Sequence, residues 1–350
     1  MAIKSEKMKL IIYSLSIFFL VSFQHQAKIN NCKKSENNDT TAIAEKSFIE
    51  LGGEKQYVEI TGLSKENPVL LFLHGGPGWP QTPHLRYFNS ALTKYMTVVS
   101  WEQSGCGQSY INNPHPKKLS LEQIIDDAHE LTQILKKKFH KNKIYLVGFS
   151  WGSMPGLKLV EKYPEDYAAY FGITQVININ RSIKVSRAWI TKQATLKGDK
   201  ETLKTLQQLE TGDTSVCKRK IDCFLTQYGL LNKYGGALFT KKGEEEIAKA
   251  ETFYDDYKKY DWFGAFLYSA YRVENDLFDA DLSTIKKVKV PMYFIMGRHD
   301  WNLPTSITLE YIKKLSAPKK EIIWFEQSGH EPLSEEASKF NQVIIDRVKK

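Results

Sequence analysis

Residues 144–155 read Ile-Tyr-Leu-Val-Gly-Phe-Ser-Trp-Gly-Ser-Met-Pro. The first four are a short apolar run typical of a buried strand, and residues 148–152 follow the pattern Gly-x-Ser-x-Gly. A strand that turns abruptly into a helix strains the backbone of the middle residue, and glycine on either side gives the turn room. The pattern therefore predicts that Ser150 is a nucleophile raised above a helix N-terminus. An ordinary glycine-rich turn is the alternative.

Strand and helix patterns alternate on both sides of this stretch. Strands are predicted over residues 56–61, 69–73, 97–101, 144–147, 169–176, 288–296 and 321–325. Helices are predicted over residues 119–139, 153–163, 305–315 and 334–349. Ser120, three residues before Gln123, resembles a capping box at the start of one of them. Such alternation indicates a mostly parallel sheet with helices between its strands.

The alternation stops in the second half of the chain, where residues 180–286 read as helices only. We interpret this block as a helical cap inserted after the sixth strand. Residues 53–179 and 287–350 then form the two parts of the α/β core, and residues 31–52 form a polar linker. The chain is 42% hydrophobic, which suffices for a full core.

A serine hydroxyl becomes a good nucleophile only when a base takes its proton. His330 directly follows the last predicted strand, and Asp300 directly follows the strand before it. Their loops lie at the same end of a parallel sheet as the Ser150 turn. The chain order Ser150, Asp300, His330 is that of the α/β hydrolases, so these residues are the predicted catalytic triad. His299 is a competing base, but it lies on the loop of the acid.

The reaction also requires hydrogen-bond donors for a developing oxyanion. Residues 73–78 read Leu-His-Gly-Gly-Pro-Gly and follow a buried strand. The backbone N–H groups of Gly76 and of Trp151, next to the nucleophile, are the two predicted donors. No metal-ligand spacing is present, and we expect neither a metal nor a cofactor.

Five motifs together resemble the proline iminopeptidase family of α/β hydrolases. They are His-Gly-Gly-Pro-Gly at 74–78, Trp-Glu-Gln-Ser-Gly-Cys-Gly-Gln-Ser at 101–109, Gly-Phe-Ser-Trp-Gly-Ser at 148–153, Gly-Arg-His-Asp at 297–300 and Ser-Gly-His at 328–330. The resemblance covers residues 55–345. It implies an α/β-hydrolase fold with a helical cap, and cleavage of an N-terminal residue, often proline, from short peptides. By position it assigns Ser150, Asp300 and His330 as nucleophile, orienting acid and base.

The chain departs from that family at several positions. Glu102-Gln103-Ser104 stands where the family usually has Asp-Gln-Arg, and Phe149 stands where it often has His. Residues 272–275, Arg-Val-Glu-Asn, resemble the family's amine-binding segment, so Glu274 is a candidate for binding a substrate ammonium. A surface ion pair is the alternative role for Glu274. A partner glutamate in a Trp-x-x-Trp-Glu setting has no match.

The expected function is therefore a serine aminopeptidase acting on short peptides through an acyl-enzyme. A small-molecule esterase or amidase with the same triad is the alternative, and an inactive binding protein is a third reading. The net charge of +9 is spread over the chain without a nucleic-acid-binding motif, so we expect no nucleic-acid partner. The oligomeric state stays open.

The N-terminus has the pattern of a targeting segment. Lys4, Lys7 and Lys9 precede an apolar run over residues 10–23, which has the length of a secretory signal core. Residues 1–30 are therefore predicted to be a signal peptide or a membrane anchor, with cleavage near Ala27 or lipidation at Cys32 as alternatives. Each places the enzyme outside the cytoplasm, periplasmic, extracellular or tethered to the membrane by this segment alone.

The remaining cysteines fit that location. Cys217 and Cys223 could close a small loop in an oxidising compartment. Cys106, in a glycine-rich turn, is expected to be a small buried residue rather than a catalyst.

Overall fold

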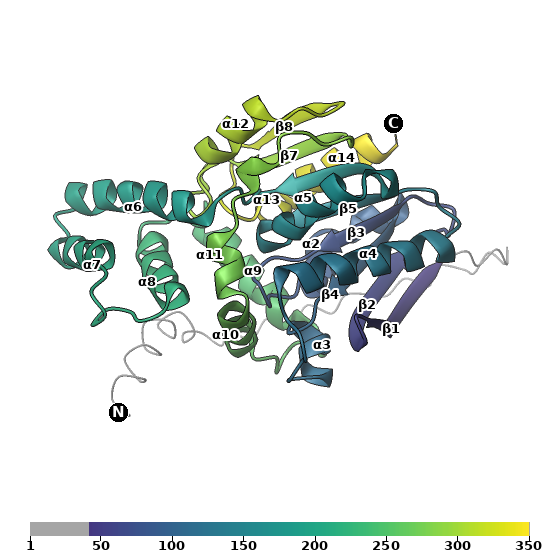
Figure 1. The fold of residues 1–350 in the computed structure, drawn as a ribbon, viewed down its shortest axis with the longest axis horizontal. Coiled ribbons are helices and arrows are strands. Elements are labelled where there is room, and N and C mark those ends of the chain that lie inside the picture. Colours follow the sequence, from purple (N-terminus) through teal and green to yellow (C-terminus); the bar gives the residue numbers. More distant parts are fainter. Residues whose placement is uncertain (1–41, 350) are drawn as a thin grey trace, which may run out of the picture. The chain divides into compact units, whose positions relative to one another are not determined.

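The computed structural model describes residues 42–349, which form one eight-stranded sheet with helices on its faces (Figure 1). The strands lie in the order β1-β2-β4-β3-β5-β6-β7-β8. Their bounds are β1 Ile43–Leu51, β2 Glu54–Gly62, β3 Val69–Leu73, β4 Thr97–Glu102, β5 Ile144–Phe149, β6 Tyr167–Ile173, β7 Met292–Gly297 and β8 Lys320–Phe325. The β1–β2 and β2–β4 pairs are antiparallel, and all other pairs are parallel. The predicted mostly parallel sheet is confirmed.

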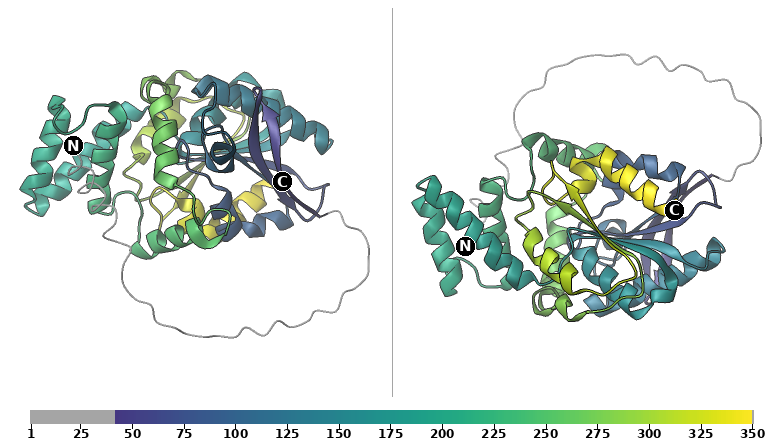
Figure 2. Two further views of the ribbon diagram at one scale, coloured as in Figure 1. Left: turned by 90° about the horizontal axis from the view of Figure 1, so that it is seen from below. Right: turned by 90° about the horizontal axis from the view of Figure 1, so that it is seen from above.

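Helices cover both faces of this sheet (Figure 2). They are α2 Thr82–Phe88, α3 Gly107–Asn112, α4 Leu121–Lys138, α5 Ser153–Lys162, α12 Thr305–Lys314, α13 Pro332–Glu335 and α14 Ala337–Val348. Side chains alternate across a strand, so Leu71 and Leu73 enter one buried cluster with α4 and α5, and Leu70 and Phe72 enter another with α14. The Ser120 hydroxyl caps α4 by accepting from the N–H of Gln123, which is one half of the predicted capping box, whereas the Gln123 side chain donates to Asp127.

The register brings the functional loops together. Leu73, the last residue of β3, lies opposite Trp101 of β4 and Gly148 of β5. The three strands are parallel, so the segments that follow them leave the same edge of the sheet. These segments are the glycine-rich loop after β3, the turn that begins at Gln103, and the Ser150 turn.

Six α-helices of the described chain occupy the stretch between β6 and β7, after the sixth strand as predicted. They are α6 Ile179–Leu196, α7 Lys200–Thr211, α8 Lys220–Lys233, α9 Lys241–Phe253, α10 Trp262–Arg272 and α11 Glu274–Asp279. Figure 1 shows α6, α7 and α8 grouped together at a distance from the sheet. They share a small buried cluster that includes Ile190, Leu206 and Leu231. A disulfide between Cys217 and Cys223 closes the connection from α7 to α8.

The structure corrects one predicted boundary. Residues 43–51 were expected to belong to the polar linker, but they form β1, the edge strand that pairs with β2. Polar and charged residues such as Glu45, Lys46 and Glu50 dilute its apolar pattern, because an edge strand exposes much of its surface. Among residues 42–349, no helix is both long and apolar enough to span a bilayer. The predicted N-terminal segment, with Ala27 and Cys32, lies outside the described residues.

Candidate active site

Ser150 lies at the junction between β5 and α5 in a strained backbone conformation. Its φ angle is 49°, in the left-handed region that non-glycine residues rarely adopt. A Cβ atom on Gly152 would lie 2.3 Å from the carbonyl oxygen of Leu73, and one on Gly148 would lie 2.7 Å from the carbonyl oxygen of Gly152. Glycine is therefore required on both sides of the serine, as the Gly-x-Ser-x-Gly pattern predicts.

The three residues of the predicted triad meet at this turn. The Ser150 hydroxyl lies 3.0 Å from Nε2 of His330, and Nδ1 of His330 lies 2.9 Å from Oδ2 of Asp300. The side chain of Asp300 is 1% exposed, and that of His330 is 11% exposed. His299, the competing base, instead stacks on Phe239 with ring centroids 4.0 Å apart. The geometry gives one continuous hydrogen-bonded path from carboxylate to hydroxyl.

The loop of His330 is held from both sides. Its backbone N–H donates to the carbonyl of Ala237, which precedes α9. Oε2 of Glu335 accepts from the N–H groups of Gly329 and Glu331. Burial opposes a charge on the imidazole, but the carboxylates of Asp300, Glu331 and Glu335 outweigh it and raise the pKa of His330 above its ordinary value. The imidazolium form is thus favoured when it is generated.

The glycine-rich loop after β3 passes beside the serine. A Cβ on Gly75 would lie 3.5 Å from Cβ of Ser150 and 3.0 Å from the ring of Phe149. Gly76 has a φ angle of 109°, which a side chain would not tolerate. Trp151, the other predicted donor, is 1% exposed and follows Ser150 in a short helical turn over Ser150–Gly152. The loop that carries Gly76 therefore passes against Ser150, and Trp151 adjoins Ser150 in the sequence.

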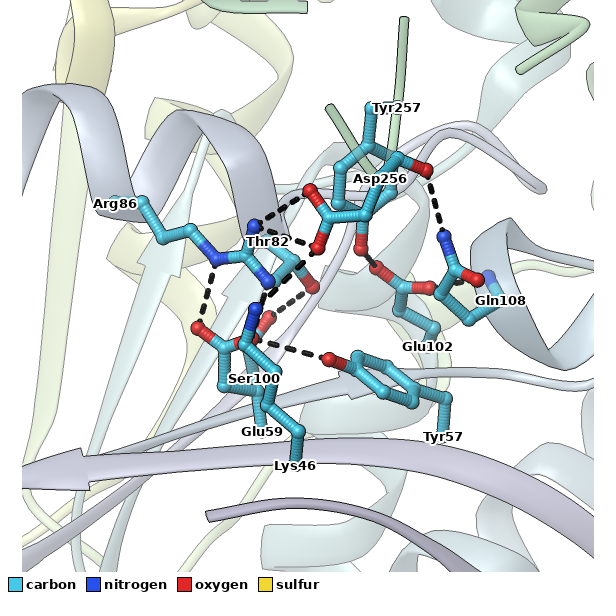
Figure 3. A network of polar contacts seen from close by, with 10 residues as sticks. All are labelled: Lys46, Tyr57, Glu59, Thr82, Arg86, Ser100, Glu102, Gln108, Asp256 and Tyr257. Carbon is cyan, nitrogen blue, oxygen red and sulfur yellow. Dashed lines mark hydrogen bonds and ion pairs between the residues drawn. The ribbon is translucent and has the colours of Figure 1, made fainter. Parts of the chain in front are cut away.

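A network of polar contacts ties the connection between α9 and α10 to the core (Figure 3). The Tyr257 hydroxyl, between α9 and α10, donates to the fully buried carboxylate of Glu102. Arg86 of α2 donates to Glu59 at 2.8 Å and to Asp256 at 2.9 Å. Burial raises the pKa of Glu102 to about 7. Glu102, which stands where the family usually has aspartate, therefore connects the core to the cap.

Glu274 lies at the first turn of α11, and its carboxylate already has partners. It forms an ion pair with Arg219 at 3.4 Å and accepts from the backbone N–H of Ile221, at the N-terminus of α8, at 3.3 Å. No contact among the described residues joins it to the triad. This geometry favours the alternative role, an ion pair between helices of the cap.

A different carboxylate pair, which the sequence analysis missed, lies next to His330. Glu331 follows the base directly, and Glu251 of α9 accepts from the indole N–H of Trp79 at 3.1 Å. His84 of α2 interacts electrostatically with both carboxylates. It is fully buried, its Nε2 lies 3.7 Å from Glu251, and that nitrogen has no hydrogen-bond partner among the described residues. These four residues come from separate segments of the chain, so no local sequence pattern predicts that they lie together.

The surroundings of the cluster are apolar and aromatic. The ring of Trp262 stacks on that of His84, with centroids 5.9 Å apart, and lies 5.2 Å from the ring of Trp79. Burial raises the pKa of Glu331, although His84 and His330 oppose the shift. No group of His, Cys, Asp or Glu in residues 42–349 has the arrangement of a metal site. The cluster is therefore a place where two carboxylates can meet a cationic group.

Comparison with known proteins gives consistent matches over most of the chain. The family model described as alpha/beta hydrolase fold matches residues 68–337. A probable aminopeptidase, YbaC of Bacillus subtilis (strain 168), is 31% identical over 309 residues, which cover 87% of this chain and 96% of that protein.

Solved structures agree in fold. A proline iminopeptidase-related protein of Thermus thermophilus superposes with a TM-score of 0.60 at 20% identity, covering 87% of this chain and 96% of that one. An esterase of Exiguobacterium antarcticum superposes with a TM-score of 0.59 at 19% identity, covering 87% and 99%. At such identities these two structures support the fold alone.

Proposed function

Because the chain belongs to the α/β-hydrolase family, in its proline iminopeptidase-like branch, we propose that it is a serine aminopeptidase that releases an N-terminal residue from short peptides. One observation carries the proposal: Ser150, strained at φ 49°, lies 3.0 Å from a histidine that an aspartate holds at 2.9 Å. The relative from Bacillus subtilis, named as a probable aminopeptidase, supports the peptide substrate.

In the proposed reaction, the Ser150 oxygen attacks the carbonyl carbon of the N-terminal residue while its proton passes to Nε2 of His330. His330 then gives this proton to the nitrogen of the leaving peptide, and the C–N bond breaks. A water, deprotonated by His330, hydrolyses the acyl-enzyme and restores the Ser150 hydroxyl. Asp300 keeps the proton of His330 on Nδ1, so that Nε2 faces the serine, and stabilises the imidazolium.

The carbonyl oxygen becomes negatively charged in both tetrahedral intermediates. The backbone N–H groups of Gly76 and Trp151 are the proposed donors to that oxygen. Because backbone donors are already in place, they need no reorganisation during the reaction. Removal of one such donor in another serine hydrolase costs about 3 kcal/mol of barrier, so the pair accounts for a large part of the proposed rate enhancement.

An aminopeptidase must also accommodate the substrate's α-ammonium group, whose unperturbed pKa is about 8. Burying this charge without a partner is costly. We assign its binding to Glu251 and Glu331, since Glu331 adjoins the catalytic base and Glu251 contacts Trp79 near the glycine-rich loop. Burial raises the pKa of Glu331, and a cation bound beside it would favour the charged carboxylate. Trp79 and Trp262 would enclose the side chain of the N-terminal residue.

An esterase or amidase for small neutral molecules is the second candidate. One observation favours it: Glu274, the carboxylate that the family resemblance assigns to amine binding, is occupied by Arg219 and the α8 N-terminus. Both candidates share the Ser150, Asp300 and His330 chemistry, so only the substrate distinguishes them.

Three matched substrates separate these functions: an aminoacyl-naphthylamide, its N-acetylated form and a p-nitrophenyl ester. The proposal predicts hydrolysis of the free-amine amide, little hydrolysis of its acetylated form, and loss of all activity in Ser150→Ala with an unchanged melting temperature. Ester hydrolysis without amide hydrolysis would favour the second candidate. Activity that survives Ser150→Ala would overturn both.

We also propose that the enzyme acts outside the cytoplasm. The apolar run at residues 10–23 supports export. The disulfide between Cys217 and Cys223 supports it independently, since disulfides persist mainly in oxidising compartments.

A further inference from the structure

We propose that Gln103 is a positioning residue for the oxyanion hole, which holds the glycine-rich loop and the residue after the nucleophile in a fixed relation. The inference rests on the proposed function, because it assumes that Gly76 and Trp151 donate to the oxyanion. Gln103 directly follows β4 and is 1% exposed. It lies between the two segments that carry these donors.

Two hydrogen bonds connect Gln103 to those segments. Its side-chain Oε1 accepts from the indole N–H of Trp151 at 3.1 Å. Its backbone N–H donates to Nε2 of His74 at 3.1 Å. Trp151 carries one proposed donor, and His74 lies two residues before the other, Gly76. One residue therefore contacts both halves of the oxyanion hole.

The contact to His74 also fixes the path of the glycine-rich loop. Because Nε2 of His74 accepts from Gln103, Nδ1 carries the proton and donates to the carbonyl of Gly75 at 2.8 Å. Burial lowers the pKa of His74 to about 4, which keeps the ring neutral with both nitrogens in these roles. The peptide group that joins Gly75 to Gly76 thus has its carbonyl held, and this same peptide group contains the Gly76 N–H.

The contact to Trp151 fixes the orientation of the Gln103 amide. An indole nitrogen can only donate, so Oε1 must face Trp151 and Nε2 must point elsewhere. That nitrogen is buried and has no hydrogen-bond partner among the described residues. A buried unpaired donor costs about 1–3 kcal/mol, so this amide is a poor choice for stability alone. The orientation of the Gln103 amide is explained by the hydrogen bond that its Oε1 accepts from Trp151.

A second pair elsewhere in the sheet provides a matched control. Gln56 of β2 accepts from the indole N–H of Trp101 at 3.0 Å and is also buried. Its amide nitrogen is fully used, by Asp127 at 2.6 Å and by the carbonyl of Leu51. Its Oε1 also accepts from the backbone N–H of Ser104, the residue after Gln103, at 3.0 Å. Among the described residues, no hydrogen bond joins Gln56 to Ser150, to His330 or to the glycine-rich loop. Gln56→Met should therefore lower stability but leave the hydrogen bond between Gln103 and Trp151 in place, so its effect on the transition state should be smaller than that of Gln103→Met.

The experiment compares Gln103→Met, Trp151→Phe, the double variant and Gln56→Met. Each is measured for kcat, KM, melting temperature and the affinity of an aminoalkyl boronic acid, which bonds to the serine and places an oxygen in the oxyanion hole. We expect Gln103→Met to lower kcat and boronic-acid affinity by roughly tenfold each with KM nearly unchanged, a fraction of the effect of losing a donor outright. Gln56→Met should lower the melting temperature and should change kcat and boronic-acid affinity less than Gln103→Met does.

Trp151→Phe keeps the ring but removes the indole donor, so it tests the same contact even if Gln103→Met does not fold. The double variant should be no worse than the more impaired single variant, because the two changes remove one hydrogen bond. Unchanged kcat and boronic-acid affinity in Trp151→Phe, or equal losses in Gln56→Met, would overturn the inference while leaving the proposed function intact. Wild-type protein that neither hydrolyses a substrate nor binds the boronic acid would overturn both.

Discussion

Asp300 binds His330 with one carboxylate oxygen and its own loop with the other. Oδ2 accepts from Nδ1 of His330 at 2.9 Å. Oδ1 accepts from the backbone N–H groups of Asn302 and Leu303 at 2.9 and 2.8 Å. The loop therefore fixes the carboxylate, and the carboxylate fixes the ring of the base.

Replacing Asp300 with asparagine should lower kcat by roughly four orders of magnitude, the loss found when the equivalent aspartate is replaced in a serine protease. The amide presents an N–H to His330 or turns away from it, which favours the wrong tautomer. Asp281→Asn is a suitable control, because Asp281 caps a turn through the N–H of Ser283 at 3.0 Å. A loss below tenfold in Asp300→Asn would show that another carboxylate orients the base.

The acidic limb of the kcat/KM profile should have its midpoint above pH 6.5. Asp300, Glu331 and Glu335 raise the pKa of His330, and the base must be neutral to accept the proton of Ser150. Activity is thus full above the raised pKa and is lost as pH falls through it. A profile measured between pH 5 and 9 on a neutral ester avoids titration of the substrate amine. A midpoint below pH 6 would contradict this prediction.

Glu251→Gln should raise KM for substrates with a free N-terminus by more than tenfold, since truncating one partner of a buried charge pair costs about 2–5 kcal/mol. It should spare neutral esters, which have no ammonium group. Glu274→Gln is the matched control: it should loosen the contact with Arg219 and α8 and leave the ratio of the two KM values unchanged. If Glu274→Gln alone changes that ratio, amine binding belongs to Glu274.

Glu102→Gln should flatten the dependence of stability on pH. Burial raises the pKa of Glu102 from 4.5 to about 7, so the folded state binds its proton more tightly than the unfolded state. The wild type should then lose stability as pH rises from 4.5 to 7, by an amount on the order of 3 kcal/mol from this group. Urea denaturation of both proteins at pH 5 and 7.5 measures the difference. If the free energy of unfolding changes equally in both proteins between these two pH values, Glu102 does not titrate in this range.

Export predicts that full-length protein leaves the cytoplasm in a host with a secretion system. Mass spectrometry of the mature N-terminus would then separate cleavage near Ala27, lipidation at Cys32 and retention as an anchor. Protein that stays soluble in the cytoplasm with an intact N-terminus would refute the prediction.

The sequence by itself determined the α/β-hydrolase fold and the loops that carry Ser150, Asp300 and His330. These features are local: a buried strand shows as a continuous apolar run, and each proposed catalytic residue directly follows such a run. Parallel strands bring their carboxyl ends to one edge, so strand order in the sequence suffices to predict that the loops meet. The family resemblance rests on the same local motifs and is confirmed by the matches over most of the chain.

Only the tertiary structure decided which carboxylates from distant parts of the chain lie near the base and which connect the cap to the core. Glu251 meets Trp79 across 172 positions of the chain, and Tyr257 meets Glu102 across 155. Their positions depend on how α9 and α10 pack against the core, which no periodicity in either segment encodes. Glu274 shows the converse, since its neighbours in sequence resemble an amine-binding segment while its neighbours in space are Arg219 and the start of α8. Local patterns record backbone conformation and burial, whereas the partner of a buried charge is set by packing between distant segments.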